Sequence, residues 1–547
     1  MQGVSESWKN AHKQSLLNES YVEVSLGITD PDALADSSPQ DNGAVYISDS
    51  SGLTDEVEKH RTPYSTLEQN LWVLDGARKA IPEQVEEGDI EDCYIGEALC
   101  DDTCVFSSKI PVITINFSKV FTKSIPGITI TWSGTYGEFA ESFVVMVYNG
   151  DTKIAEKEVL GNRTITTFVP IDITDYNRIV LMITKWCLPH HRARVEEIFL
   201  GLKKVYDKTS LFDYTHTISV HPVSLALPKS EISFSIDNVS GEYNPQNPSG
   251  ISKYLTERIE LKSRYGLKMS DGSVEWIKGG TFFLSEWYAK QNGLTAEFVA
   301  KDLLGFMSAI YKEEVEEIKD RSFYDLAEMV FRSAKLPLTS DGRERWVIDE
   351  SLKSITTTAP LPEDTIANCL QLIANATLCK LYQDRDGVFH ISPFSFKVRP
   401  DASEVLDYEI SSSNSYTKPE ITLAKPVGLL WVKCYTYTLD NSGVHSDTQD
   451  IGHQFMDEGE GETIIIDNPL VTDQLQCGKI AIWMYNYYLR WRKSLDFSWR
   501  GDVRLDGLDF IKNIGAYDSS RVLMTEVSYK FSGAFRATGK GKVIEDV

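Results

Sequence analysis

The chain has 547 residues and a formal net charge of −25, with 42% of its residues hydrophobic and 25% charged. This length is too great for one hydrophobic core and predicts roughly three to five domains of ordinary globular composition. The acidic balance excludes a sequence-independent nucleic-acid binder, which needs a cationic footprint, and no apolar run is long enough for a membrane span.

Residues 1–105 combine one clear strand with polar arms and loops. The run YVEVSLGI (21–28) alternates as a strand does, whereas residues 31–66 are rich in Asp, Ser, Pro and Gly, which indicates a long loop. Residues 83–104 are acidic and irregular. The opening residues lack the apolar core of a signal peptide, so we expect the chain to be made and assembled in a cytoplasm.

Residues 106–205 have a different pattern of apolar and turn residues. Short apolar runs such as ITITWS (128–133), FVVMVY (143–148) and IVLMIT (179–184) are separated by turn residues. This spacing is typical of an antiparallel β-sandwich of about a hundred residues.

Residues 206–312 continue with strands, and in EISFSI (231–236) every second residue is apolar. The period changes in residues 313–400, where SFYDLAEMVFRSAKLP (322–337) and TIANCLQLIANAT (365–377) predict two helices. A hairpin follows, with Asp-Gly of DRDG (384–387) at its turn. We therefore expect a small α/β domain between two strand-rich regions.

Residues 401–547 return to strands on both sides of one long helix, predicted over residues 472–491. Leu475, Ile482, Tyr485 and Leu489 lie on one side of that helix. Between two strand-like segments near the middle of the chain, IDNVSGEYNPQNPSG (236–250) is dense in turn residues. We expect it to be a rigid strand-to-strand connection, followed by a short helical turn at ISKYL.

No metal or cofactor site is predicted. The eight cysteines form no CxxC pair, and a fourth ligand beside Cys187, His190 and His191 is not evident. A calcium loop counted from Asp237 would place Val239 and Gly241 at ligand positions, which fails. We expect free thiols in a reducing compartment.

No catalytic residue is predicted either. The chain has no GxSxG, HExxH, Walker A or GxGxxG sequence, and nothing selects one carboxylate pair among its many acidic residues. Arg500, Gly501 and Asp502 spell an integrin-binding tripeptide, but Gly-Asp between two strands is ordinary turn chemistry. We expect a protein that is not an enzyme.

Carbohydrate binding by the sandwich is a hypothesis with named residues. Sugars stack on aromatic rings, and their hydroxyl groups bond to Arg, His and carboxylate side chains. The alternative is that the tryptophans are core and the basic residues are rim. The candidate residues are Trp132, Tyr136, Trp186, His190, His191 and Arg192.

Several stretches carry a resemblance to a known family. The run from Ile232 to Trp287, STLEQNLWVLDG (65–76), and the pair WRGDVRLDGLDFI (499–511) and FSGAFRATGKGKV (531–543) resemble baseplate hub, or tail-associated, proteins of phages and prophages of Gram-positive, clostridia-like bacteria. The sandwich, with ITITWSGTYGEFAESFVVMVY (128–148) and HHRARVEEIFLG (190–201), looks like an inserted discoidin or galactose-binding jelly roll.

The resemblance implies a mainly β fold with α+β parts, containing two hub-type β-barrels and a small α/β linker domain. Residues 1–105 would contribute to the first barrel at 206–312, residues 106–205 would be the inserted jelly roll, 313–400 the middle domain, and 401–547 the second barrel with its long helix. It also implies a homotrimer.

The function implied is that of a structural virion protein at the tail tip. It would join the tail tube to fibre or spike proteins and form part of the channel through which DNA passes as cargo, where acidic walls avoid trapping phosphates. The sandwich would contact a host surface glycan or a neighbouring tail protein. Two alternatives are a receptor-binding adhesin and a virion-borne enzyme that processes cell-wall glycan.

Overall fold

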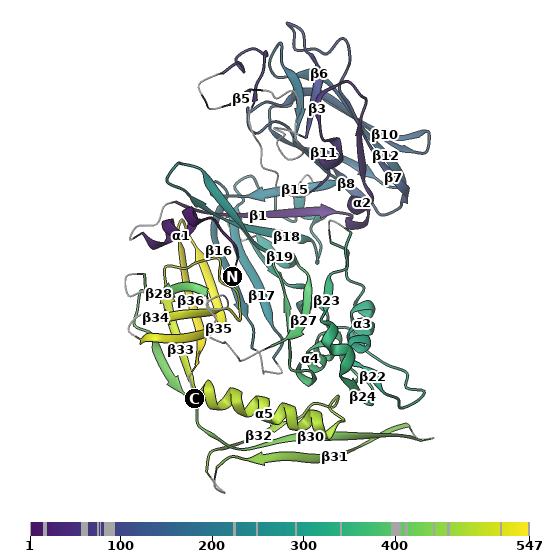
Figure 1. Ribbon diagram of the computed structural model, residues 1–547. Coiled ribbons are helices and arrows are strands. Elements are labelled where there is room, and N and C mark those ends of the chain that lie inside the picture. The colour runs from purple at the N-terminus through teal and green to yellow at the C-terminus, as the bar shows by residue number, and fades with distance from the viewer. Residues whose placement is uncertain are drawn as a thin grey trace. The chain divides into compact units, whose positions relative to one another are not determined.

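The structure is a computed structural model, and it divides the chain into two units (Figure 1). Unit 1 comprises Met1–Ser25, Val205–Leu336 and Arg345–Val547; unit 2 comprises Leu26–Lys204 and Pro337–Glu344. Each unit is considered by itself. The described residues are 2–14, 19–55, 64–73, 76, 78–80, 93–221, 226–247, 250–289, 293–339, 342–394, 406–410, 414–440, 443–456, 460–514 and 517–544.

Unit 2 is a β-sandwich built from two antiparallel sheets that share one apolar core. The larger sheet has the order β10-β9-β12-β7-β2, with strands Thr152–Val159, Ala140–Asn149, Tyr176–Trp186, Val112–Phe121 and Ser38–Asp41. The smaller sheet has the order β11-β8-β14, with strands Thr166–Ile173, Ile125–Thr131 and Glu197–Phe199. Phe143, Val145 and Val147 of β9 are fully buried at alternate positions, as a two-layer core requires.

Unit 2 extends further towards the N-terminus than the predicted sandwich. Residues 1–105 were expected to join the first barrel, but only the first part of that range lies in unit 1. Ala33, Leu34 and Leu53 are buried in the sandwich core, and the short β2 pairs with β7. β6 (Tyr94–Leu99) lies between β3 (Val45–Ser48) and β13 (Arg192–Val195). The apolar side chains of these loops complete the core, which explains their association with it.

Most strands of a 13-stranded sheet belong to unit 1. Its main path is β15-β1-β18-β19-β20-β17-β16-β35-β36-β33-β29. In that order the strands span Gly201–Tyr206, Ser20–Thr29, Glu260–Lys268, Val274–Ala289, Thr295–Lys301, Lys229–Asp237, Leu211–Ser219, Tyr517–Phe531, Phe535–Ile544, Lys493–Trp499 and Glu420–Leu423. β34 (Phe510–Ile514) also pairs with β35, and β28 (Leu406–Ile410) pairs with β34.

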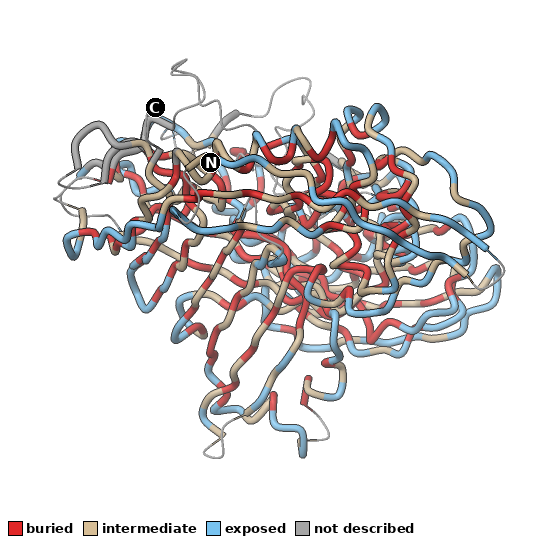
Figure 2. The backbone as a smooth tube through the Cα atoms, turned by 90° about the horizontal axis from the view of Figure 1, so that it is seen from below, coloured by how far each residue is buried: buried red, intermediate tan, exposed pale blue. Residues whose placement is uncertain are grey.

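This sheet corrects the expectation of two separate barrels. Strands from both predicted barrel regions belong to one open sheet in the described part of the chain, because β16 pairs directly with β35 over Tyr214–Ser219. The N-terminal β1 pairs with β18, so strands far apart in the sequence are neighbours in this sheet. Strands hold 50% of the residues and helices 15%, which confirms the mainly β class with α+β parts. Figure 2 shows buried and exposed positions alternating along the long strands.

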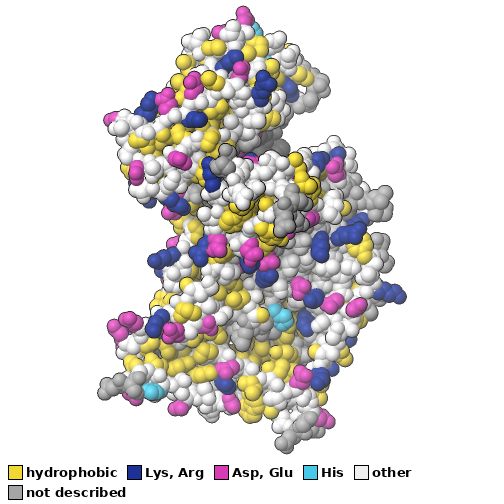
Figure 3. Space-filling model, turned by 180° about the vertical axis from the view of Figure 1, so that it is seen from behind, with side chains coloured by type: hydrophobic (Ala, Val, Ile, Leu, Met, Phe, Trp, Pro, Cys, Tyr) yellow, Lys and Arg dark blue, Asp and Glu magenta, His cyan; other side chains and the backbone are white. Residues whose placement is uncertain are grey.

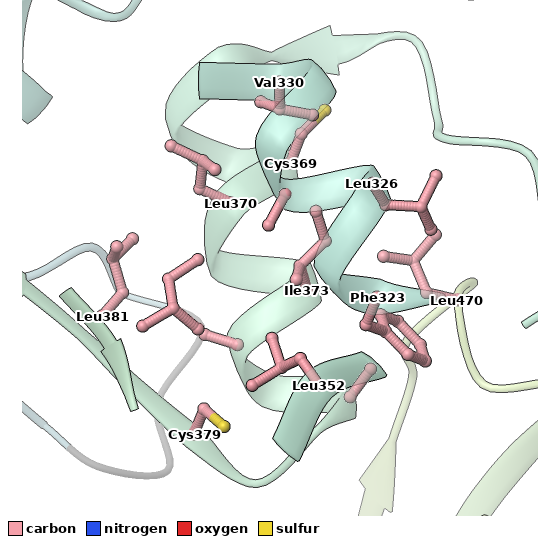
Figure 4. Packing of buried hydrophobic residues seen from close by; sticks show 14 of the residues in the cluster. Phe323, Leu326, Val330, Leu352, Cys369, Leu370, Ile373, Cys379, Leu381 and Leu470 are labelled. Atoms are coloured by element: carbon pink, nitrogen blue, oxygen red, sulfur yellow. The ribbon is translucent and has the colours of Figure 1, made fainter. Parts of the chain in front are cut away.

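The predicted α/β region forms around two helices, α3 (Phe323–Ala334) and α4 (Ile366–Ala376). Ser322 caps α3 by accepting a hydrogen bond from the Asp325 amide, and Thr365 does the same for α4 with Asn368. Leu326, Val330, Leu370 and Ile373 are fully buried in the shared core (Figure 4). A small sheet has the order β23-β27-β26, with strands Trp346–Ile348, Phe389–Pro393 and Cys379–Gln383.

The long helix α5 (Gln474–Arg490) covers one face of a three-stranded sheet with the order β31-β30-β32. These strands span Gly443–Gln454, Val427–Asp440 and Glu462–Ile466. Cys477, Ile480, Ala481 and Met484 are the core positions of α5. Leu475 and Ile482, grouped on one side by the sequence, are instead 75% and 57% exposed.

The N-terminal helix α1 (Glu6–Lys13) belongs to unit 1, and Ser5 caps it by accepting from the Trp8 amide. No helix among the described residues is long and apolar enough to cross a membrane.

Candidate functional site

The two tryptophans of the predicted carbohydrate site lie in the sandwich core. Trp132 and Trp186 have no exposed surface, and their rings meet edge to face with centroids 6.1 Å apart. Trp132 Nε1 donates to Thr167 Oγ1 at 2.9 Å, and Trp186 Nε1 donates to Glu138 Oε2 at 2.8 Å. Their polar atoms are satisfied inside the fold, so neither ring offers a face to a sugar in this conformation.

The other four candidates lie around one end of the sandwich. His191 is buried, with Nδ1 2.9 Å from Glu138 Oε1. His190 is half exposed, with Nε2 2.8 Å from Asp102 Oδ1. The Arg192 guanidinium lies over the Tyr46 ring, 4.2 Å from its centroid. The fourth candidate, Tyr136, donates from its hydroxyl to the Tyr64 carbonyl at 3.1 Å.

Three residues that the sequence did not single out hold this end together. Arg194 is fully buried and forms a bidentate ion pair with Glu68, with Nη1 2.8 Å from Oε2 and Nη2 2.6 Å from Oε1. Glu68 Oε2 also accepts from the Arg192 amide at 2.9 Å. Glu138 Oε2 lies 3.8 Å from Arg194 Nη1 and links the pair to His191 and Trp186.

Electrostatics favour the charged forms within this cluster. Burial alone would raise the pKa of Glu68, but the hydrogen bonds and charge of Arg194 outweigh it and hold that pKa below its usual range. Burial alone would lower the pKa of His191, but the hydrogen bond and charge of Glu138 raise it. The arrangement ties the segment around Glu68 to strand β13, so we interpret it as a clasp rather than a reaction centre.

The exposed aromatic surface of unit 2 lies elsewhere than predicted. Trp72 is 56% exposed and Tyr46 is 39% exposed, and both come from the segments that precede the predicted sandwich. The Tyr136 ring lies within 5.1 Å of the Arg194 guanidinium and 4.8 Å of that of Arg78. The exposed rings of Tyr46 and Trp72 thus lie outside the predicted set of residues.

The cysteines and histidines of unit 2 do not converge on one point. Cys100 donates from Sγ to the Leu188 carbonyl at 3.0 Å, and Cys187 Sγ accepts from the Phe139 amide at 3.3 Å. Within the described ranges, no group of three or more His, Cys, Asp or Glu side chains is arranged to hold a metal ion. All eight cysteines are free thiols.

The Arg-Gly-Asp tripeptide is part of the framework of unit 1. Asp502 is fully buried and forms an ion pair with Arg504. Arg500 donates to the carbonyl oxygens of His12 and Gln14 at 2.6 and 2.7 Å, which fixes the N-terminal arm. Neither charged side chain of the tripeptide is available to an external receptor in this arrangement.

The turn-rich segment 236–250 contains a series of consecutive hydrogen-bonded turns. Backbone amides at every third position, from Gly241 to Gly250, each donate to the carbonyl three residues earlier, at 2.8 to 3.1 Å. Gly241 has φ +67°, and a Cβ at Gly250 would lie 2.4 Å from the Glu242 carbonyl oxygen. The helical turn η2 (Ile251–Tyr254) follows. The predicted connection between two strands, β17 and β18, is confirmed, and its rigidity stays a prediction. Pro248, which the prediction also used, lies outside the described residues.

Arg385 of the DRDG hairpin bonds to residues from other regions of unit 1. The Arg385 guanidinium donates to the carbonyls of Lys278 and Val503 at 2.5 and 2.8 Å, and to Asp506 Oδ1 at 2.8 Å. It thereby joins the α/β region to β19 and to the loop before β34. No local sequence signal indicated this role.

Comparison with protein-family models gives no match, and comparison with curated proteins gives none either. Among solved structures, a tail protein from Neisseria meningitidis MC58 matches with a TM-score of 0.42 and 12% identity, over 63% of this chain and 94% of that one. The 43 kDa tail protein of prophage MuSo2 from Shewanella oneidensis gives 0.40 and 11%, over 62% and 95%. The prophage tail protein gp18 from Listeria monocytogenes EGD-e gives 0.38 and 9%, over 63% and 91%. All three of these solved structures are tail proteins, two of them from prophages.

Proposed function

We propose that this chain is a structural protein of a phage tail tip, acting as the baseplate hub between the tail tube and the distal fibres or spikes. The observation that carries the proposal is the direct pairing of β16 with β35, which unites strands from both barrel-like regions in one sheet. A component that transmits load along a tail needs its halves to move as one body. The sequence resemblance of residues 232–287 gives this frame its specific role.

The two strand-rich regions suggest how such a hub meets a six-fold tube. Two related regions per chain in a homotrimer provide six similar positions around an axis, while the chain itself repeats three times. Arg385 would keep those regions and the α/β domain in fixed register, because its donors reach all three. Assembly would take place in the host cytoplasm, and the mature location would be the virion.

DNA would pass through this assembly as cargo. The net charge of −25 disfavours retention of phosphates on the protein. On the face seen in Figure 3, Lys and Arg side chains lie among Asp and Glu, so this face is not a uniformly acidic wall.

Unit 2 would supply host attachment or contact with a neighbouring tail protein, without catalysis. The half-exposed indole of Trp72 favours a glycan ligand, because an exposed aromatic ring is the platform on which sugars stack. Binding of purified protein to host cell-wall polysaccharide tests this part. Trp72→Ala should weaken that binding at least about tenfold, a loss of roughly 1.4 kcal/mol, whereas the buried-core substitution Ile183→Val should leave it unchanged. Equal binding by wild type and Trp72→Ala would contradict a Trp72 platform.

The hub itself is tested by the oligomeric state of the purified full-length chain. We expect ring-like trimers in electron micrographs and a trimer mass by light scattering. A chain that stays monomeric at high concentration and binds no other tail component would contradict the proposal. Release of sugar from cell walls would instead favour the enzyme, and binding to cells without assembly would favour the adhesin.

A further inference from the structure

Two buried thiols of unit 1 lie on elements that pack against each other, strand β30 and helix α5. Cys434 of β30 is 5% exposed, and Cys477 of α5 has no exposed surface. Both belong to one apolar core, together with Val432 of β30 and Ile480 of α5. Cys434 is the last buried position of β30 on the side that α5 covers, because Thr436 is exposed.

A side-chain hydrogen bond places the two cysteines at the same level of this contact. Gln449 of β31 is the direct cross-strand partner of Cys434, so their side chains lie on the same face of the sheet. Gln474 Nε2 donates to Gln449 Oε1 at 3.2 Å. Gln474 and Cys477 are three positions apart in α5, and residues at this spacing are neighbours on one side of a helix. The hydrogen bond therefore brings the first turn of α5, and Cys477 with it, to Cys434.

Backbone hydrogen bonds fix the same end of the helix. The amide of Tyr435, the residue after Cys434, donates to the Val471 carbonyl at 2.9 Å. Asp473 then caps α5, and the Cys477 amide donates to the Asp473 carbonyl at 3.0 Å. The segment between the first of these bonds and Cys477 is short and hydrogen-bonded, which limits how far the two thiols can separate.

The two thiol groups act directly on each other. Burial raises the pKa of Cys477 to about 12, and the hydrogen bond and charge of Cys434 contribute to the rise. The nucleophile in disulfide chemistry is the thiolate, so a buried and protonated pair reacts slowly with oxidants. Both thiols would therefore persist through assembly in the host cytoplasm, which keeps thiols reduced.

We propose that Cys434 and Cys477 form a disulfide bond once the particle has left the reducing cytoplasm of the host. This redox modification joins α5 to the β30–β31 hairpin. Its timing rests on the proposed function, because a virion is released into an oxidising exterior, where disulfides form and persist. Its chemistry rests only on the two facing thiols.

The oxidant is a low-molecular-weight disulfide such as oxidised glutathione. One protein thiolate attacks a sulfur of the oxidant, forms a mixed disulfide and releases one glutathione thiolate. The second protein thiolate attacks the protein sulfur of the mixed disulfide and releases the second glutathione. The protein loses two hydrogen atoms and gains one S–S bond, and the oxidant is reduced to two thiols.

The bond would close a loop of the chain that contains β31 and β32. A cross-link over a long loop stabilises a fold mainly by removing conformational freedom from the unfolded chain. The outer side of α5 contributes little to its attachment, since Leu475 and Ile482 are exposed. A covalent bond on the inner side would hold α5 on the sheet.

Oxidation of the purified full-length chain with oxidised glutathione tests the bond. Proteolytic digestion and mass spectrometry without reduction should reveal one pair of peptides joined through Cys434 and Cys477, with a mass lowered by two hydrogen atoms. The joined pair should form about ten times faster at pH 8 than at pH 7, because the thiolate fraction rises by that factor.

Three alanine variants serve as controls. Cys434→Ala and Cys477→Ala should each abolish the joined pair, whereas Cys369→Ala, which removes another buried thiol of the same core, should retain it. In urea, oxidised wild type should unfold at a higher midpoint than wild type reduced with dithiothreitol, and neither Cys434→Ala nor Cys477→Ala should show this shift. Circular dichroism checks the fold of each variant.

Two results with the purified chain would overturn the disulfide. One is glutathione attached to Cys434 or Cys477 without the joined pair, which would show that the two sulfurs do not meet. The other is that both thiols stay free after prolonged oxidation.

Intact particles separate this inference from the proposed function. Particles digested in the presence of a thiol-blocking reagent should contain the joined pair. Reduced Cys434 and Cys477 in particles that carry the chain at the tail tip would overturn the inference while the hub stands. Absence of the chain from the tail tip would contradict the hub and leave the disulfide of the purified chain as measured.

Discussion

Arg385 donates from Nε to Oδ1 of Asp506 at 2.8 Å, although the two residues are 121 positions apart in sequence. Its other nitrogens bond to backbone carbonyls of β19 and of the loop around Val503. A single arginine in a hairpin turn therefore connects three regions of unit 1. Burial would lower the pKa of Arg385, but the charge of Asp506 outweighs it and raises that pKa, so the guanidinium stays charged.

Removing this guanidinium should destabilise unit 1. Arg385→Met leaves the Asp506 carboxylate and several carbonyl oxygens without their donors, which costs about 3 to 5 kcal/mol. Urea unfolding followed by tryptophan fluorescence measures the loss. Arg332→Met, which removes an exposed ion pair with Glu328 on α3, is the matched control and should cost less than about 0.5 kcal/mol. Equal losses of unfolding free energy in the two variants would show that Arg385 does not hold the three regions together.

The clasp of unit 2 makes a second prediction. Arg194→Met should destabilise the sandwich by about 3 to 5 kcal/mol, because Glu68 keeps a buried charge without its partner. Adding Glu68→Leu to Arg194→Met removes that charge and should recover a large part of the loss. Thermal melts of the two single variants and the double variant measure the coupling. Strict additivity of the two losses would contradict a direct pair.

Glu68 also predicts that the stability of the sandwich falls at acidic pH. Its pKa is lowered in the folded state, so its contribution is fully present above the unfolded value of about 4.3 and is lost as pH falls through the folded value. Between about pH 5 and pH 3, wild type should lose more stability than Glu68→Gln, which has no charge to titrate. Parallel pH profiles for the two proteins would contradict the assignment.

His216 predicts that the stability of the fold also depends on pH in a second, higher pH range. It is buried at the junction of β16 with β35, with Nδ1 2.7 Å from the Tyr265 hydroxyl and Nε2 3.0 Å from Ser230 Oγ. Burial, aided by the charge of Arg385, lowers the pKa of His216 to about 3. The neutral imidazole is thus favoured in the folded state, and its contribution is present above the unfolded value of about 6.5 and is lost as pH falls towards the folded one.

Unfolding at two pH values tests this junction. Between pH 7 and pH 5, His216 should account for roughly 2 kcal/mol of lost stability, from about 1.4 kcal/mol per pH unit below 6.5. His216→Gln should be less stable at pH 7 and should lack this part of the pH dependence. His445→Gln removes an exposed imidazole and should leave the wild-type profile intact. An unchanged slope in His216→Gln would contradict the prediction.

Glycine-to-alanine substitutions in the turn segment 236–250 and in helix α5 should change stability in opposite directions. Gly250→Ala places a Cβ 2.4 Å from the Glu242 carbonyl oxygen, and the required backbone shift should cost about 1 to 3 kcal/mol. Gly478→Ala in α5 meets no atom within 4 Å and should stabilise the helix by about 0.5 to 1 kcal/mol. Chemical denaturation measures both. A neutral Gly250→Ala would show that the loop is less rigid than its hydrogen bonds indicate.

Local sequence patterns predicted where helices and strands lie better than they predicted which strands pair with each other. Ser322 and Thr365 mark helix starts in sequence because each acts through a residue three positions away. The sandwich strands were equally readable from alternation. By contrast, Ser38–Asp41 (SPQD) has no apolar alternation, and its place in the sandwich follows from pairing with β7. The sequence therefore did not predict that Ser38–Asp41 belongs to unit 2.

The candidate site illustrates the same limit. Aromatic and basic residue types selected the candidates, but residue type does not distinguish a buried ring from an exposed one. Glu68 and Arg194 are separated by 126 positions, and no spacing rule connects them. The exposed Trp72 was not among the candidates, because its segment, residues 65–76, was assigned by resemblance to the first hub domain and not to the sandwich.

The most direct test of the central claim is the position of this chain in the intact particle. Electron micrographs of virions labelled with an antibody against the chain should show label confined to the tail tip, below the tube. Label on the head or along the tail shaft, or particles without label, would contradict a tail-tip hub.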